Sequence, residues 1–302
     1  MCKKLVYLAL LLVISLASSI PAANIIWVSD QYDELVDQMP DDFAWVELLE
    51  ANGHTVENTA GAGFGDGYWR TMDADKVAAL NAADLVIFSR NSDSGNYNND
   101  DEVNQWNSVT APMILMTPYL SRNSRWFWVG NATLAQDGGT PKIQAVDAAN
   151  PIFSGVTLDA KNQVDIYDQS VGTGTVSFYG DIDVGNGTLI ATVAGQNWSA
   201  IAEWEAGVEF YNGAGQIASG RRMLLLMGTR EGVGYGRGEY NLNADGEKLF
   251  LNAIEYMTGS LKRLKAHSPT PADGSLYGDT WVNLTWSVGE TAASHDIYFG
   301  KV

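Results

Sequence analysis

Residues 111–122, APMILMTPYLSR, read as a buried strand that runs directly into a tight turn. In open α/β sheets, ligands bind and nucleophiles are presented beyond the carboxyl ends of the strands. The turn offers Thr117 and Tyr119 on either side of Pro118. A threonine hydroxyl needs a positioned base to act as a nucleophile, and proline lacks the backbone N–H that an oxyanion hole would use. The turn therefore predicts a ligand-binding position without a catalytic residue.

The segment that follows, SRNSRWFWVG (121–130), combines guanidinium groups with large aromatic rings. Aromatic rings and arginines suit the stacking of a sugar or the binding of a carboxylate. The pattern favours the other interpretation, a hydrophobic plug beneath a long loop. The ligand candidates in this flank are Arg122, Arg125, Trp126 and Trp128.

Arg90 and Asn91 follow another apolar run, LVIF (85–88), at its carboxyl end. Parallel strands end at the same edge of a sheet, so these side chains are expected to face the same crevice as Thr117 and Tyr119. They complete the set of candidate ligand-binding residues.

Two carboxylate pairs support a rival interpretation, a carbohydrate-active hydrolase. The pairs are Glu203 with Glu205 and Glu231 with Glu239. Glycosidases need two carboxyl groups about 5–9.5 Å apart across a cleft. Glu203 and Glu205 share one face if they lie on a strand, although a solvated strand face explains them equally well.

No cofactor or metal site is predicted. The runs DIDVGNG (181–187) and NSDSGNYNNDDE (91–102) offer oxygen ligands for calcium, but neither has the twelve-residue EF-hand pattern with its closing glutamate. The glycine-rich EGVGYGRG (231–238) lacks the Lys-Ser/Thr of a phosphate loop. We expect it to carry a loop across the carboxyl edge of the sheet.

The N-terminus predicts export. Lys3 and Lys4 precede an apolar run, 5–16, and small residues follow it, so residues 1–23 are expected to be a signal peptide that is cleaved. The only cysteine, Cys2, lies inside this segment, so the mature chain would have no disulfide and no cysteine nucleophile. The expected location is secreted or periplasmic, with no membrane association after cleavage.

The charge of the chain bears on its partners. With 18 basic and 36 acidic residues the formal net charge is −18, which disfavours nucleic acid and anionic lipid. The partners that remain are polysaccharide or other envelope proteins.

The elements that would position these residues alternate between strand and helix. Apolar strands at 24–30, 54–58, 85–88, 113–116 and 223–227 are separated by amphipathic helical patterns, which predicts a mostly parallel sheet with helices on both faces. Between 163 and 211, short strand-like runs punctuated by Gly and Asn predict an antiparallel extension. The fold class is thus α/β, with a flavodoxin-like sheet.

Residues 24–259 resemble the class I glutamine amidotransferase-like superfamily, near its trehalose-utilisation-like group. The resemblance is carried by IIWVSD, FAWVELLEANGHTV, AADLVIFSRNSDSG, PMILMTPYLSR and GRRMLLLMGTR with GEKLFLNAIEYMTG. It implies a Cys nucleophile at the turn after PMILMT and a His–Glu pair near residues 228–240. The chain has Thr117-Pro118-Tyr119 at the first place and no histidine at the second, so the triad is missing.

The tail resembles a second family. PTPADG, VNLTWS and AASHDIYFG are similar to the opening of a fibronectin type III-like module of planctomycete-type secreted proteins. A linker at 260–270 and an incomplete module at 271–302 are therefore expected, as a β-sandwich normally takes about 100 residues. The expected function is a secreted, non-catalytic binding or scaffolding module of a larger extracellular protein, associated with carbohydrate.

Overall fold

The computed structural model describes residues 22–30, 40–58, 67–99, 101–139, 141–168, 170, 174–232, 235–261, 267–270 and 284–287. The expected signal peptide (1–23) lies outside the described residues except for Ala22 and Ala23. The expected fibronectin III-like module (271–302) lies outside them except for 284–287.

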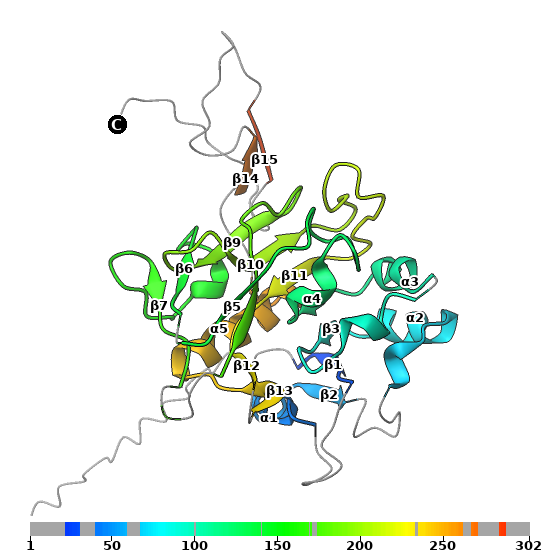
Figure 1. Cartoon of the computed structure of the whole chain (residues 1–302), viewed down its shortest axis with the longest axis horizontal. Helices are drawn as coiled ribbons and strands as arrows, with labels where there is room; N and C mark the ends of the chain where they lie inside the picture. The colour runs from blue at the N-terminus through cyan, green and yellow to red at the C-terminus, as the bar shows by residue number, and fades with distance from the viewer. Residues whose placement is uncertain are drawn as a thin grey trace, which may run out of the picture.

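Five parallel strands form one half of the main sheet (Figure 1). They lie side by side in the order β2-β1-β3-β4-β11, and each neighbouring pair is parallel. These strands are β1 (Asn24–Val28), β2 (Thr55–Asn58), β3 (Leu85–Phe88), β4 (Met113–Leu115) and β11 (Arg222–Leu225). The expected α/β class with a large, mostly parallel central sheet is confirmed.

The connecting helices follow the expected pattern. They are α1 (Phe43–Ala51), α2 (Ala74–Asn81), α3 (Glu102–Ser108), α4 (Pro118–Ser121) and α5 (Ala244–Met257), with 3-10 turns η1 (Tyr68–Arg70), η2 (Ser94–Asn96) and η3 (Pro151–Phe153). Asp73 caps α2 by accepting a hydrogen bond from the Lys76 N–H at 2.8 Å. Gly53 and Gly259 adopt the positive φ that ends α1 and α5.

Antiparallel strands extend the sheet beyond β11. The order continues β11-β10-β9-β6-β7, while β8 pairs with β10 and β5. These strands are β5 (Leu134–Asp137), β6 (Ile143–Ala145), β7 (Gln163–Val164), β8 (Val176–Tyr179), β9 (Thr188–Val193) and β10 (Ser199–Trp204). The predicted extension is present, although β5 and β6 begin before its expected start at residue 163.

Two hairpin-like pairs complete the described strands. β12 (Thr229–Gly232) pairs with β13 (Tyr235–Tyr240), and β14 (His267–Thr270) pairs with β15 (Thr285–Ser287). β14 lies within the range expected to be a linker, so the last four residues of 260–270 are a strand. Among the described residues, no helix is long and apolar enough to span a membrane.

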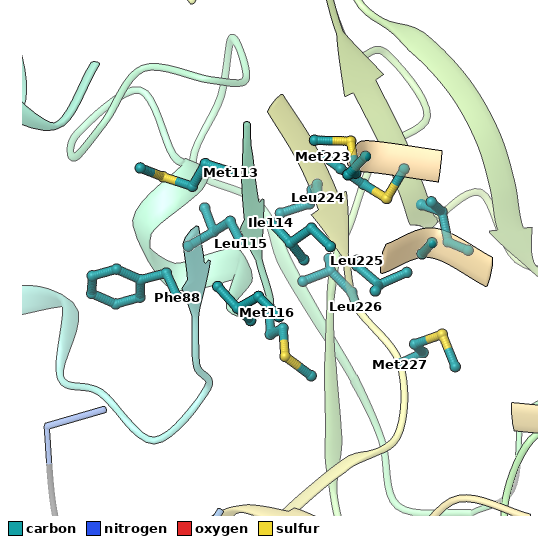
Figure 2. Close-up of a cluster of buried hydrophobic side chains, with 14 of the residues drawn as sticks. Phe88, Met113, Ile114, Leu115, Met116, Met223, Leu224, Leu225, Leu226 and Met227 are labelled. Carbon is teal, nitrogen blue, oxygen red and sulfur yellow. The ribbon is translucent and has the colours of Figure 1, made fainter. Parts of the chain in front are cut away.

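Methionine and branched apolar side chains pack together at the centre of the sheet (Figure 2). Leu115 of β4 lies between Phe88 of β3 and Leu224 of β11, and Ile114 lies between Ile87 and Met223. All of these residues are fully buried. Such strands read as continuous apolar runs because helices and loops cover both faces of the sheet. The polar residues that follow each run are therefore held at fixed positions along its edge.

At the amino-terminal ends of the parallel strands, a buried arginine makes several hydrogen bonds. Arg222 donates to the backbone carbonyl oxygens of Asn107, Val109 and Ala111, at the end of α3 and just beyond it. The last carbonyls of a helix lack intrahelical partners, and a cation favours the negative end of the helix dipole. Arg222 thus joins the start of β11 to the end of α3.

We expect Arg222→Met to destabilise the protein by about 2–4 kcal/mol, since several buried carbonyl oxygens would lose their donor. The measurement is urea denaturation. Lys248→Met, at an exposed position on α5, is the control and should change stability by less than about 0.5 kcal/mol. Equal stabilities of the two variants would contradict this role for Arg222.

Candidate functional site

The polar residues after β1 and β3 meet where the strand order reverses. β2 lies on one side of β1 and β3 on the other, so the chain crosses the sheet in both directions from this point. Ligands of open α/β sheets bind in the crevice at such a switch point. Asp30, after β1, donates its N–H to the Asn91 carbonyl oxygen at 2.9 Å, which ties the two strand ends together.

Asp42 lies at the centre of this crevice. Its carboxylate accepts from Trp27 Nε1 at 2.9 Å, Ser29 Oγ at 3.0 Å and Asn91 Nδ2 at 3.2 Å, and also from Ser89 Oγ. These donors come from β1 and from the turn after β3, whereas Asp42 immediately precedes α1. We call Ser29, Asp42, Ser89 and Asn91 the switch-point cluster.

Burial governs the ionisation of Asp42. The side chain is fully buried, and desolvation raises the pKa of its carboxyl group, while the four donors oppose that shift. A buried carboxyl group with a raised pKa is a frequent mark of a functional site. Its oxygens are already occupied by protein donors, however, so the cluster primarily joins structural elements.

A second carboxylate stands beside the cluster. Asp30 forms an ion pair with Arg70 of η1 and accepts from the Asp93 N–H at 3.2 Å and from Asn96 Nδ2 at 3.4 Å. The Arg70 side chain is 36% exposed, whereas that of Asp30 is fully buried. Asp30 thus fastens η1 and the η2 turn to the end of β1.

Arg90 connects the crevice to the antiparallel extension. It forms an ion pair with Glu231 of β12, and its guanidinium carbon lies 4.5 Å from the centroid of the Tyr119 ring. Ser177 of β8 donates to Glu231 at 2.8 Å, and its hydroxyl lies 3.3 Å from the Tyr119 hydroxyl. The predicted neighbours Arg90 and Tyr119 are therefore in contact.

The β12–β13 hairpin covers the switch point. Gly238 approaches the backbone so closely that an added Cβ would lie 2.9 Å from Asn91 N, and its carbonyl oxygen accepts from Trp45 Nε1 at 3.0 Å. The Arg237 N–H donates to Asp41 at 3.3 Å. The described part of the glycine-rich run therefore lies at the carboxyl edge of the sheet, as the sequence predicts, but it forms two antiparallel strands where a loop was expected.

The turn after β4 has a structural role. Thr117 is buried, and its hydroxyl oxygen accepts from the Tyr119 N–H at 3.3 Å, which caps α4. Pro118 occupies the first helical position, where its missing N–H has no cost. The one histidine whose side chain is described, His54, lies at the other end of β1, where it accepts from the Ala23 N–H at 3.3 Å.

Tyr119, Arg122 and Gln136 form a solvent-accessible surface next to this turn, which we call the Tyr119 surface. Gln136 Nε2 donates to the Tyr119 hydroxyl at 3.0 Å. Arg122 donates to the Tyr119 carbonyl oxygen at 2.7 Å and to Ser94 Oγ at 3.3 Å. Burial lowers the pKa of Arg122, and the positive charge of Arg125 lowers it further. Arg125 itself donates to the Ser124 carbonyl oxygen at 2.9 Å.

Trp126 and Trp128 are core residues, which removes them from the set of ligand candidates. Both are fully buried. Trp126 stacks on Trp106 with ring centroids 5.0 Å apart, and Trp128 stacks on Phe210 at 5.5 Å. Their indole N–H groups donate to Tyr97 O and Asn107 Oδ1. The aromatic run thus forms the hydrophobic plug that the sequence pattern favours.

The carboxylate pairs have internal partners. Glu203 and Glu205 both contact Arg221, at 3.4 and 3.6 Å, so a guanidinium group joins them. Glu203 lies opposite Met223, near the start of β11 and away from the crevice. Glu231 pairs with Arg90, whereas Glu239 pairs with Arg230.

Sequence reasoning missed Asp30, Asp42, Arg70 and Ser177. Asp30 directly follows the apolar run of β1, so the strand-end argument that located Arg90 would also have located it. Asp42 precedes an amphipathic helix and resembles an ordinary N-cap, yet its side chain makes no capping bond. Within the described residues, no group of three or more His, Cys, Asp or Glu side chains could hold a metal ion.

Comparison with known proteins identifies no family. No protein-family model and no curated protein matches the chain. Among solved structures, the cytoplasmic protein STM3548 from Salmonella typhimurium is similar with a TM-score of 0.44 and 10% sequence identity, over 77% of this chain and 97% of that chain. A likeness this weak says nothing about function.

Asp42→Asn tests the effect of burial on the switch-point cluster. Because the pKa is raised on folding, the folded chain holds a proton at pH values where the unfolded chain has lost it. The wild type should therefore lose stability relative to Asp42→Asn as pH rises from 4.5 to 7.5, by about 1.4 kcal/mol for each unit of pKa shift sampled in that interval.

The measurement is urea denaturation of both proteins across that pH range. Asp75→Asn, at an exposed position in the first turn of α2, is the control, and its stability relative to the wild type should stay constant. If the wild type instead gains stability over Asp42→Asn as pH rises, the hydrogen-bond donors lower the pKa of Asp42 by more than burial raises it.

Proposed function

We propose that this chain is a secreted, non-catalytic binding or scaffolding module of a larger extracellular protein, and that it binds polysaccharide at the Tyr119 surface. The observation that carries the proposal is the division of roles after β4. Thr117 and Pro118 build the start of α4, while Tyr119 and Arg122 remain accessible beside it.

The finer fold assignment supports this proposal. The parallel half has the order β2-β1-β3-β4-β11, which is the order of flavodoxin-like sheets when strands are numbered within that half. We assign residues 24–259 to the amidotransferase-like superfamily on the motifs of the sequence, without its catalytic residues. We likewise assign the tail to a fibronectin III-like module, and residues 1–23 to a cleaved signal peptide.

Arg122 indicates the chemistry of the ligand. Its guanidinium group is partly desolvated and lies close to a second cation, Arg125, both of which disfavour its charge. A ligand carboxylate would offset both effects and could accept two parallel hydrogen bonds. The Tyr119 ring and Gln136 add a stacking face and an amide, so a polysaccharide that contains uronate units fits the surface.

The rival hydrolase has less support from the geometry. Glu203 and Glu205 contact Arg221, and Glu231 contacts Arg90. A glycosidase needs one carboxyl group as a proton donor and the other as a base or nucleophile. The arginine contacts hold these carboxylates against the protein itself, so they do not face each other across an open cleft.

Binding of the full chain to polygalacturonate tests the proposal. Arg122→Ala and Tyr119→Ala should each weaken binding at least tenfold, measured by affinity electrophoresis, because they remove the cation and the stacking face. Lys161→Ala removes an exposed lysine on the loop before β7 and should leave binding unchanged.

The same experiment includes a search for reducing ends released from the polysaccharide. Release of reducing ends that stops in Glu231→Gln would replace the binding module with the hydrolase. Binding that is equal in all three alanine variants would remove the Tyr119 surface from the proposal.

A further inference from the structure

A surface pocket of about 400 Å³ lies between the turn that follows β8 and the segment that follows β10. The turn 181–187 forms one wall, and residues 211–212 form another. Its lining residues with side chains are Asn131, Tyr179, Asp183, Asn186, Tyr211 and Asn212. Tyr179 is fully buried, so Tyr211 supplies the accessible aromatic ring. Gly130 and Gly185 complete the lining.

We infer that this pocket binds an uncharged saccharide unit. Sugar hydroxyls need donors and acceptors within the same small space, and the C–H faces of a sugar pack against aromatic rings. Carboxamide and carboxylate groups supply those hydrogen bonds. The pocket combines both features, and no function assigned above uses it.

Several of the polar atoms remain available to a ligand. Asn212 is exposed, and the Nδ2 atom of Asn186 donates to Glu209 O at 2.8 Å, which directs its Oδ1 atom elsewhere. Asp183 accepts from the Gly185 N–H with Oδ1 at 2.9 Å, so its second oxygen can accept from a sugar hydroxyl. Burial raises the pKa of Tyr211, so this phenol remains a donor at neutral pH.

The walls of the pocket are held by buried contacts. Phe210, next to Tyr211 in the chain, packs between Trp128 and Trp204, with centroid distances of 5.5 and 5.8 Å. Gly185 has a φ of +64°, and an added Cβ there would lie 2.5 Å from Tyr211 Cβ. Asn131 Nδ2 donates to Asp181 at 2.9 Å. A preformed pocket lowers the ordering cost of binding.

The charge of the pocket selects against anions. None of the eight described lining residues is a lysine or an arginine, and Asp183 is acidic. A phosphate, sulfate or uronate group would therefore meet repulsion without a compensating cation, whereas an uncharged pyranose would not.

The pocket is separate from the Tyr119 surface, and the inference does not rest on the proposed function. Ser177, which contacts the Tyr119 hydroxyl, and Tyr179, which lines the pocket, are two residues apart on β8, and none of Tyr119, Arg122 and Gln136 lines the pocket. They differ in chemistry, because Arg122 lies at one and no cation lines the other.

A glycan array tests the inference with the full chain. The probes are uncharged hexasaccharides of glucose, mannose, galactose and xylose, alongside oligogalacturonate. At least one uncharged probe should bind, and isothermal titration should show at least a tenfold loss of affinity in Tyr211→Ala and Asn212→Ala. Gly130→Leu should also block binding, because its side chain would project toward the Tyr211 ring and Gly130 does not adopt a positive φ.

The matched control is Lys161→Ala, at an exposed position outside the pocket lining, which should retain the uncharged probe. Asn212 is exposed, so its variant separates loss of a contact from loss of folding, and thermal unfolding checks all variants. The inference is overturned if no uncharged probe binds, or if binding persists in the three pocket variants. Loss in Arg122→Ala alone would also overturn it and would place the sugar at the Tyr119 surface. If oligogalacturonate is the one probe that does not bind, that result contradicts the proposed function and leaves this inference intact.

Discussion

The buried carboxylate of Asp42 joins three elements that are distant in sequence. Trp27 and Ser29 belong to β1 and its end, Asp42 introduces α1, and Ser89 and Asn91 follow β3. A carboxylate without donors in this position would be costly, because burial removes its hydration. The four donors offset part of that cost, and they do so only when both strand ends and the helix start are in place.

Residues of the protein itself fill the crevice of this sheet. The switch-point cluster contributes to this arrangement. Once the ends of β1 and β3 are drawn together around Asp42, the β12–β13 hairpin can lie across them, with Gly238 against Asn91. Glu231 of this hairpin pairs with Arg90, and their side chains are only 7% and 14% exposed. A sheet edge that hosts chemistry in other α/β proteins is therefore occupied by the chain itself. Accessible polar and aromatic groups lie further along, toward β5 and β8.

Aromatic residues have two roles in this protein, since some form the core and others lie at the surface. Trp126 and Trp128 lie beneath the surface and hold the loop after α4 against Phe210 and Trp106. Tyr119 and Tyr211 lie at the surface, each beside polar side chains. Their neighbours differ, with Arg90 and Arg122 near Tyr119 and amides near Tyr211. That difference in charge is the basis for assigning the two places different ligands.

The sequence by itself determined the strand–helix alternation, the parallel half of the sheet and the crossing of its edge by the glycine-rich run. Apolar runs such as 85–88 and capping residues such as Asp73 depend on neighbouring residues, so they can be predicted from the local sequence. It also located Arg90, Asn91, Thr117 and Tyr119 at strand ends, because parallel strands end at one edge. Only the tertiary structure decided which polar residues meet. Asp42 reads locally as an N-cap, and Trp126 is compatible with either a stacking platform or a buried plug. Burial and the direction of a side chain depend on contacts between distant segments, which no single stretch of sequence encodes.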